Sequence, residues 1–335
     1  MGDVARIAGV HKATASRALN PATVGRVHAE TARRVKEAAT ALGYRPNMNA
    51  RGLRMRSTSS IGVLIPNVLS QLYPPLIRGV EQILRDHDHF ALIADSENDP
   101  DREKLALDNL ISRQVDGLIA AAHRTGRPSL QAVAAAGTPV VFLEDADDLG
   151  PASIVALDMA SGVDALTDLL VDAGHTRLAH IASPATGGDA AERSALHVAA
   201  LVRRGFAPDA LLQVVAKDFT VDGGHGAATR LLAEHPEVTA VMAYNDLIAI
   251  GTLRAAHEAG LRVPTDLTVT GFNDVPLVAE LTPPLTTVRL DMTQLGREAT
   301  EVLMAAIAGD PTPQRRLLPV TLVPRGSHGP PRARP

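Results

Sequence analysis

Short apolar runs alternate with helical stretches from residue 61 onward, and this alternation constrains the fold of the chain more than any other feature. The strand-like runs cover 61–65, 90–94, 117–121 and 139–143, with helical stretches near 75–87, 102–112 and 129–136 between them. The runs are apolar at successive positions, as in strands of a parallel sheet covered by helices on both faces. The sequence therefore predicts an α/β body.

The same alternation begins again near residue 154, which predicts a second, similar half of the body. Its strand-like runs cover 154–157, 178–182, 212–215, 240–243 and 267–270, and the chain closes with a strand at 286–290, a helix near 291–308 and a strand near 317–323. In open α/β sheets, ligands bind beyond the carboxyl ends of the strands. We therefore expect a ligand pocket between two lobes.

The first 56 residues differ in charge from all that follows. They contain 11 Lys and Arg against 3 Asp and Glu, whereas the rest of the chain contains 22 against 34, giving net charges of +8 and −12. A basic segment of this kind is typical of a surface that meets a polyanion such as nucleic acid, which would repel the acidic body. The charge division predicts two separate tasks.

Three helical stretches follow one another in the basic segment, namely Asp3–Ala8, Lys12–Leu19 and Ala29–Leu42. Gly9 lies between the first two, where a chain leaving a helix often needs a positive φ, and Gly43 ends the third. Two helices joined by a short glycine-containing turn form the helix-turn-helix pattern. The side chains expected to face inward are apolar: Val4, Ala5, Ala8, Ala15, Ala18, Leu19, Val35, Ala38, Ala39 and Leu42.

Composition excludes several classes of protein. The chain has no Cys, which excludes a disulfide scaffold, thiolate metal sites and thiol catalysis. No apolar run is long enough to span a bilayer and the N-terminus lacks the order of a signal peptide, so we expect a cytoplasmic protein without a membrane span. The Pro- and Arg-rich residues 327–335 are expected to form a disordered tail.

The sequence carries no catalytic motif that we can identify. G-x-S-x-G and H-E-x-x-H are absent, so we expect neither enzymatic activity nor a cofactor. Asp86-His87-Asp88-His89 resembles a metal-binding run. It falls at the expected C-terminus of a helix, where His and charged residues are ordinary, and we expect no metal site there.

Several short segments resemble, in the right order, the lactose-repressor (LacI/GalR) family of bacterial transcription regulators, from Asp3 to about Gly326. The segments are DVARIAGV (3–10), TASRALN (14–20), ETARRV (30–35), ALGYRPN (41–47) and ARGLR (50–54). The resemblance implies a small all-α helix-turn-helix domain followed by a periplasmic-binding-protein-like α/β body of two Rossmann-like lobes. It implies these boundaries: the helix-turn-helix domain at 1–46, a hinge helix and linker at 47–58, an N-terminal lobe at 59–156 plus 286–313, and a C-terminal lobe at 157–285 plus 314–326.

The resemblance also assigns roles on the second helix, the recognition helix. Lys12, Ala13 and Arg17 take the variable positions that read bases in the major groove. Arg17 suits the O6/N7 edge of guanine, and Ala13 can contact a thymine methyl. The remaining positions of the domain are expected to hold phosphates or to pack the domain against the DNA backbone. They are Thr14, Ser16 and Arg26 for phosphates, and Tyr44 and Asn47 for packing.

Residues 47–55 match the hinge helix of the family. Leu53 falls at the leucine that wedges into the minor groove between two central base steps, which bends the duplex. Arg51 and Arg54 flank it as phosphate partners. A helix of about nine residues is too short to be stable alone, so we expect it to fold when paired with its twin on DNA. Gly52, in place of a common Ser, weakens this helix by up to ~1 kcal/mol.

The family resemblance assigns effector contacts to both lobes. Leu72 and Tyr73 take the places of paired aromatics, Phe219 takes a second stacking position, and Glu144 stands where Asp is commoner. The polar positions of the C-terminal lobe are Asp189, Arg193, Asn245, Asp246 and Asn273. An Arg side chain, amides and a carboxylate can satisfy hydroxyl groups in both directions, and an aromatic ring suits the apolar face of a sugar. Each also has an ordinary alternative role, such as a helix cap for Asn245.

Three functions follow from these features. The first is a homodimeric regulator, which the family resemblance implies to be a repressor, that binds a pseudo-palindromic operator in double-stranded DNA under control of a small-molecule effector. Carbohydrate is the expected effector and a nucleobase or nucleoside the alternative. The second is a sugar-type solute-binding protein, which the body alone would permit, but which the basic head argues against. The third is an α/β enzyme, for which no site is visible.

Overall fold

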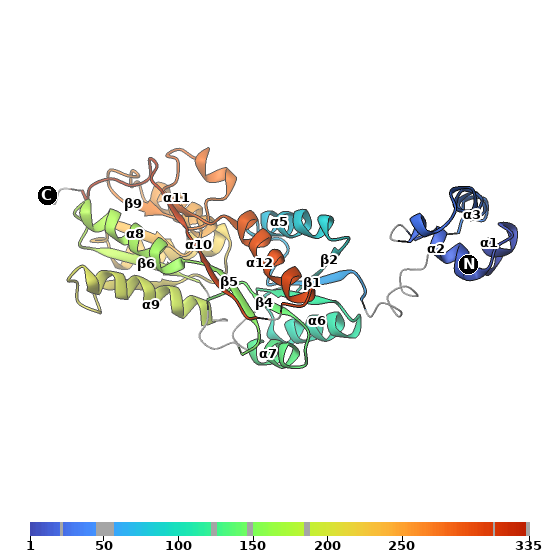
Figure 1. Cartoon of the computed structure of the whole chain (residues 1–335). Coiled ribbons are helices and arrows are strands. Elements are labelled where there is room, and N and C mark those ends of the chain that lie inside the picture. The colour runs from blue at the N-terminus through green and yellow to red at the C-terminus, as the bar shows by residue number, and fades with distance from the viewer. Residues whose placement is uncertain are drawn as a thin grey trace. The chain divides into compact units, whose positions relative to one another are not determined.

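The computed structural model describes residues 1–20, 23–44, 57–121, 126–145, 150–183, 188–310 and 312–332, with only the backbone of 188–192. The chain forms two compact units, Met1–Thr58 and Ser59–Pro335, and each is treated by itself (Figure 1). The unit boundary falls at the end of the predicted linker, after residue 58. The two units therefore correspond to the basic head and the acidic body.

The first unit is a helical domain with an alanine-rich core. Its elements are α1 (Gly2–Ile7), α2 (Lys12–Ala18), the 3-10 helix η1 (Val24–Arg26) and α3 (Ala29–Ala41). Gly9 has a φ of 61°, so the turn between α1 and α2 uses the conformation that favours glycine. The helix-turn-helix prediction is confirmed.

One detail of this head differs from expectation. Leu42, predicted to face inward, is 43 % exposed because α3 ends before it and the chain turns at Gly43, so that Tyr44 packs against the core instead. The start of α2 is capped by His11, since its Nδ1 accepts a hydrogen bond from the amide of Ala13 at 3.2 Å.

The first lobe of the body is built on a six-stranded parallel sheet. Its strands are β1 (Ser60–Ile65), β2 (Phe90–Asp95), β3 (Gly117–Ala120), β4 (Val140–Phe142), β5 (Ser153–Leu157) and β11 (Arg315–Leu318), in the order β11-β5-β4-β3-β1-β2. The core residues divide the helices between the two faces. One face carries α5 (Tyr73–Asp86) and α12 (Met292–Ile307), and the other carries α6 (Pro100–Ser112) and α7 (Arg127–Ala135).

The second lobe repeats this design on a four-stranded parallel sheet. Its strands are β6 (Leu178–Ala182), β7 (Leu211–Val215), β8 (Ala240–Ala243) and β9 (Thr268–Thr270), in the order β7-β6-β8-β9. Helices α8 (Met159–Asp172) and α9 (Gly188–Arg203) cover one face, and α10 (Val221–Glu234) and α11 (Asp246–Glu258) the other (Figure 1). The predicted pair of α/β lobes is confirmed.

The described chain crosses between the lobes three times, after Leu157, after Arg289 and after Leu318. The strands β10 (Thr287–Arg289) and β12 (Thr321–Val323) pair antiparallel beside the second lobe. The predicted lobe boundaries need correction here. β11 pairs with β5 in the first-lobe sheet, so residues 314–318 belong to the first lobe, and β10 adjoins the second lobe rather than the first.

The C-terminal segment also differs from expectation. Ser327 is fully buried, and its hydroxyl donates to the carbonyl of Val269 at 2.6 Å. The carbonyl oxygen of Gly329 lies 2.9 Å from the ring Nε2 of His175. Residues 327–332 therefore pack onto the second lobe, and the prediction of a disordered tail from residue 327 is wrong for them. The same small and proline residues that predicted disorder by composition allow this segment to pack closely against the lobe.

Two glycines set the distance between α5 and α12. A Cβ atom at Gly79 would lie 2.1 Å from the carbonyl oxygen of Thr293, and one at Gly296 would lie 2.3 Å from that of Leu76. Neither approach leaves room for a side chain. The close crossing holds the start of α12, which adjoins the interlobe connection at Leu290, against the helix that begins at Tyr73.

Candidate effector cavity and DNA-reading surface

Helix α2 presents the predicted base-reading side chains on its exposed side. Lys12, Ala13 and Arg17 are exposed, while Ala15 and Ala18 on the opposite side are buried in the head core. Ala13 and Arg17 are four residues apart and share a face of the helix. Thr14 and Ser16 are partly buried at its flanks, and Arg26 is exposed at the end of η1.

Other parts of the predicted DNA surface can be placed only in part. Tyr44 packs against the core of the head. Asn47, Arg51, Leu53 and Arg54, and with them the predicted hinge helix, lie outside the described residues.

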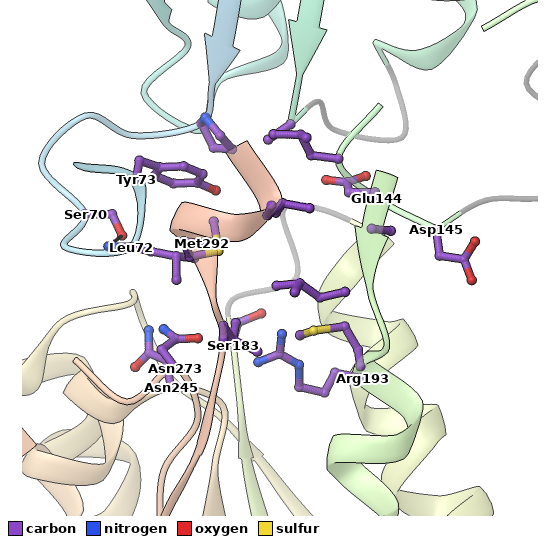
Figure 2. A pocket seen from close by; sticks show the side chains of 18 of the residues that line it. Ser70, Leu72, Tyr73, Glu144, Asp145, Ser183, Arg193, Asn245, Asn273 and Met292 are labelled. Atoms are coloured by element: carbon purple, nitrogen blue, oxygen red, sulfur yellow. Dashed lines mark hydrogen bonds between the residues drawn. The ribbon is translucent and has the colours of Figure 1, made fainter. Parts of the chain in front are cut away.

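A cavity of about 420 Å³ lies between the lobes of the body, at the carboxyl ends of the strands of both sheets (Figure 2). Its volume is in the usual range for a small-molecule site. Apart from Arg127 and Arg193, which lie on helices, the polar and aromatic residues that line it follow strand ends: Asn67, Ser70 and Tyr73 after β1, Asn98 after β2, Glu144 and Asp145 after β4, Asp158 after β5, Ser183 after β6, Phe219 after β7, Tyr244 and Asn245 after β8, and Asn273 after β9.

Arg193 is a cation on the described part of the second-lobe wall. Its guanidinium donates a hydrogen bond to the carbonyl of Tyr244 at 2.7 Å. It also lies over two aromatic rings, 4.2 Å from the ring centre of Tyr244 and 4.4 Å from that of Phe272. These contacts orient the guanidinium plane, so its remaining N–H groups are presented in a defined direction.

Asn245 and Asn273 lie beside each other on the same wall (Figure 2). The side-chain oxygen of Asn245 caps α11 by accepting from the amide of Ile248 at 2.8 Å, which leaves its NH₂ group as the part suited to a ligand. The ordinary role and the predicted role thus coexist in this residue.

Asp246, which was predicted to contact the effector, lies outside the cavity. It is fully buried and is not among the residues lining the cavity, because its carboxylate accepts from the hydroxyl of Thr287 at 2.7 Å and from the amide of Val275 at 2.8 Å. Burial raises the pKa of Asp246. The structure gives this residue a role in holding β10 and corrects its assignment to the cavity wall. The side chain of Asp189 lies outside the described residues.

In the described part of the first-lobe wall, Glu144 and Asp145 each have an arginine partner. Glu144 pairs with Arg127 at 2.9 Å, and both side chains are largely buried. Asp145 is held by Arg315 of β11, at 2.6 Å and 2.8 Å from the two carboxylate oxygens. Leu72 and Tyr73 also line this wall, with Tyr73 at the start of α5.

Apolar residues of the interlobe connections complete the cavity. Leu157, Met159, Leu290, Met292 and Leu317 line it at or next to the three crossings. Phe219 faces Tyr244 with ring centres 5.7 Å apart and planes at 55°. The cavity therefore has polar side chains on both lobes and apolar surfaces between them, and any closure of the lobes would change its shape.

Two histidine rings, tilted by 43° to each other, lie in the core of the second lobe, close to Arg193. His180 on β6 and His197 on α9 are at most 1 % exposed, and their ring centres lie 4.7 Å apart. Burial lowers the pKa of His180 to about 4, and burial together with the nearby His180 and Arg193 lowers the pKa of His197 well below its usual value. Both rings are neutral at pH 7.

The motif search missed several lining residues, among them Asn98, Arg127, Asp145, Ser183 and Tyr244. The rule that ligands bind at strand carboxyl ends would have found most of them, since they directly follow predicted strands. Arg127 has no such signal, because it begins α7; at the wall it pairs with Glu144.

Neither a metal cluster nor a membrane-spanning helix is found in the part of the chain that the structure describes. No group of three or more His, Cys, Asp and Glu side chains there could hold a metal ion. His89, from the metal-like run, has its Nε2 3.3 Å from Asp116 and its Nδ1 2.7 Å from the carbonyl of His87. None of the described helices is both long and apolar enough to cross a bilayer.

Comparison with known proteins agrees with both units. Residues 1–47 match the bacterial regulatory proteins of the lacI family, and residues 167–328 match the periplasmic binding protein-like domain. The ribose operon repressor of Escherichia coli is 34 % identical over 98 % of this chain and 99 % of its own length, and the transcriptional repressor CytR of the same organism is 32 % identical over 98 % and 95 %.

Solved structures of lacI family regulators are similar to this chain over nearly its whole length. The lac repressor dimer bound to operator and the anti-inducer ONPF is 27 % identical, with a TM-score of 0.86, over 97 % of each chain. A complex of the regulator CelR with cellobiose is 29 % identical, with a TM-score of 0.71, over 97 % of this chain and 98 % of the other. The chain thus belongs to the lacI family of bacterial regulatory proteins and is a DNA-binding transcriptional regulator controlled by an effector.

Proposed function

We propose that this regulator is a repressor whose effector is a carbohydrate bound in the cavity between the lobes. The observation that carries the proposal is that hydrogen-bond donors on one wall of the cavity lie opposite an acceptor on the other wall. Donors from Arg193 and Asn245 face a carboxylate, Glu144, and the apolar crossings lie between them. Sugar hydroxyls both donate and accept, and their ring faces are apolar, so they match such walls.

The relatives support the same class of ligand. One relative at 34 % identity is named a ribose operon repressor. A lacI family regulator of Enterococcus faecium has a structure with bound ribose, at 26 % identity and a TM-score of 0.70, and CelR has one with cellobiose. Within the cavity we assign ligand contacts to Leu72, Tyr73, Glu144, Arg193, Phe219, Asn245 and Asn273.

A thermal-shift titration with D-ribose, D-galactose, cellobiose and adenosine tests this assignment. A sugar at 100 times its Kd should stabilise the body by ~2.7 kcal/mol. Arg193→Met should abolish most of that shift, because it removes the oriented donors. The matched control is Arg203→Met on the same helix, whose exposed side chain pairs with Asp164. A shift with adenosine alone would favour the nucleoside alternative, and a full shift in Arg193→Met would remove Arg193 from the site.

For DNA, we propose that Lys12, Ala13 and Arg17 read base edges and that Thr14, Ser16 and Arg26 hold phosphates. The exposure of the three reading positions on one side of α2 supports the first part. Tyr44 and Asn47 would pack the head on the DNA backbone, and the wedge of Leu53 with Arg51 and Arg54 would act in the minor groove. Effector closure of the lobes would then alter the hinge, by differential affinity for the two states.

We propose a homodimer that reads a pseudo-palindromic operator, as the lac repressor is a dimer on its operator. The edge strand β2 leaves Phe90 and Ile93 about half exposed, and Leu105 on the neighbouring α6 is 62 % exposed. Apolar side chains at a sheet edge suit a second copy of the chain.

Ile93→Glu should shift the protein from dimer to monomer in sedimentation equilibrium, since it buries a charge in that interface. Val215→Glu is the matched control, as an equally exposed apolar residue on the edge strand of the other sheet. A dimer that Ile93→Glu leaves intact would exclude this surface.

We further propose that the protein acts in the cytoplasm, where operator DNA is found, and that the cavity binds its ligand without converting it. The membership of a family of DNA-binding regulators supports both statements. Recovery in a periplasmic fraction, or turnover of a bound sugar followed by NMR, would contradict them.

A further inference from the structure

The segment that carries Asn273 to the cavity has an unusual backbone. Asn273 has a φ of 122° and Asp274 a φ of 59°, and L side chains rarely adopt such values. Asn273 lies well beyond the left-handed helical region that Asn tolerates, so its conformation is strained. Strain of this kind persists only where contacts with surrounding residues impose it.

Asp274, the next residue, is held by two ion pairs. Its carboxylate is only 6 % exposed and pairs with two arginines from the interlobe strands. Oδ2 accepts from Nε of Arg289, the last residue of β10, at 2.7 Å, and Oδ1 accepts from a guanidinium N–H of Arg325, just after β12, at 2.6 Å. The Arg325 pair is largely removed from water, whereas the Arg289 side chain is 55 % exposed, so the Arg325 pair is the stronger of the two.

The two arginines are themselves anchored to the same strands. Arg325 also donates to the carbonyl of Leu285 at 2.8 Å. Backbone bonds continue the connection, since the amide of Asn273 donates to the carbonyl of Val288 at 2.8 Å. Asn273 is thus joined, through its own amide and through the next residue, to strands that run between the lobes.

We propose that Asp274 is a positioning residue, which holds Asn273 in its strained conformation at the cavity wall and couples it to β10 and β12. The inference rests on the proposed role of Asn273 as an effector contact. A bond between ligand and Asn273 then acts directly on two of the three connections between the lobes. Asp274 does not itself line the cavity.

A cycle of thermal unfolding without ligand tests the strain. Asn273→Gly removes the backbone strain that a side chain causes at a positive φ, and should raise the Tm of the full-length protein by about 2–4 °C. In an Asp274→Asn background the segment is no longer held, so the same change should raise the Tm by less than about half as much. The penalty that glycine imposes on the unfolded chain is common to both backgrounds and cancels in the cycle.

Asp266→Asn is the matched control background. Asp266 also pairs with an arginine in the second lobe, Arg262, at 2.8 Å, but its side chain does not line the cavity or contact β10 or β12. Asn273→Gly should there give the same gain in Tm as in the parent protein. An equal gain in the parent and in Asp274→Asn would overturn the proposal.

Binding of D-ribose, measured by calorimetry below the Tm of every variant, tests the coupling to ligand. Asp274→Asn should weaken D-ribose binding at least about tenfold, and Asp266→Asn less than about twofold. A residue that only stabilises the fold would lower the Tm without changing the Kd of the folded protein. Unchanged affinity in Asp274→Asn would therefore overturn the positioning role. Absence of D-ribose binding in the parent would count against ribose as effector, and the unfolding cycle would still decide the role of Asp274.

Discussion

Raising the salt concentration from 50 to 200 mM should weaken operator binding by this regulator by ~10³- to 10⁵-fold. The head carries a net charge of +8, and a dimer presents two heads, so about 6–10 phosphate contacts are expected and each releases counterions. The body, at −12, contributes repulsion instead. The measurement is a fluorescence-anisotropy titration at several salt concentrations, with an operator selected from random DNA.

Two single substitutions separate base reading from phosphate binding in the same assay. Arg17→Ala should cost ~1–3 kcal/mol on the selected operator and relax discrimination at one base pair in each half-site. Arg26→Ala should weaken binding to all sequences alike and reduce the salt slope by ~1. Full sequence discrimination in Arg17→Ala would remove this residue from the reading surface, and a nearly flat salt dependence would contradict the role given to the basic head.

Acidification from pH 7 to pH 5 should reduce the free energy of unfolding by about 2 kcal/mol through His180 alone. Burial lowers the pKa of this residue from 6.5 to about 4 in the folded state, so the unfolded chain binds the proton first. The stabilisation is complete above pH 6.5 and is lost as the pH falls towards 4. His197, whose pKa is also lowered, acts in the same direction.

Urea unfolding followed by circular dichroism at both pH values measures this effect, because the chain has no Trp to report by fluorescence. Asp246 has a raised pKa and opposes the trend, so wild type must be compared with a variant. His180→Asn is suited to this, since an amide can still donate to the carbonyl of Met242 that lies 2.8 Å from the imidazole Nδ1. The stability difference between the two proteins should change by about 2 kcal/mol between the two pH values. A constant difference would mean that His180 is not held neutral by burial.

Local sequence patterns were enough to predict the elements and the fold. Glycines at helix ends, apolar spacing in the head and apolar runs in the body are each decided by neighbours within a few residues. The family resemblance identified Tyr73, Glu144, Phe219, Asn245 and Asn273, all of which line the cavity. Their contact with an effector stays a proposal.

Two wrong predictions, those for Asp246 and for residues 327–332, have one physical cause. In each, the position of the residues is set by partners that are distant in the chain. Asp246 follows a strand end, as a ligand residue would, yet Thr287 and Val275 hold its carboxylate in the interior. Residues 327–332 are rich in Pro and Gly, yet the second lobe offers them Val269 and His175 as partners. Local composition contains no information about either set of partners.

The sequence by itself determined the division into a basic helix-turn-helix head and an acidic two-lobed body, because charge and periodicity are properties of short segments. The tertiary structure alone decided which side chains of the body meet in the cavity, and that Asp274 is tied to Arg289 and Arg325. Those contacts join segments brought together by three crossings between the lobes. The position of a crossing strand is set by its hydrogen bonds to neighbouring strands. Its own residues do not determine which of the two sheets it joins.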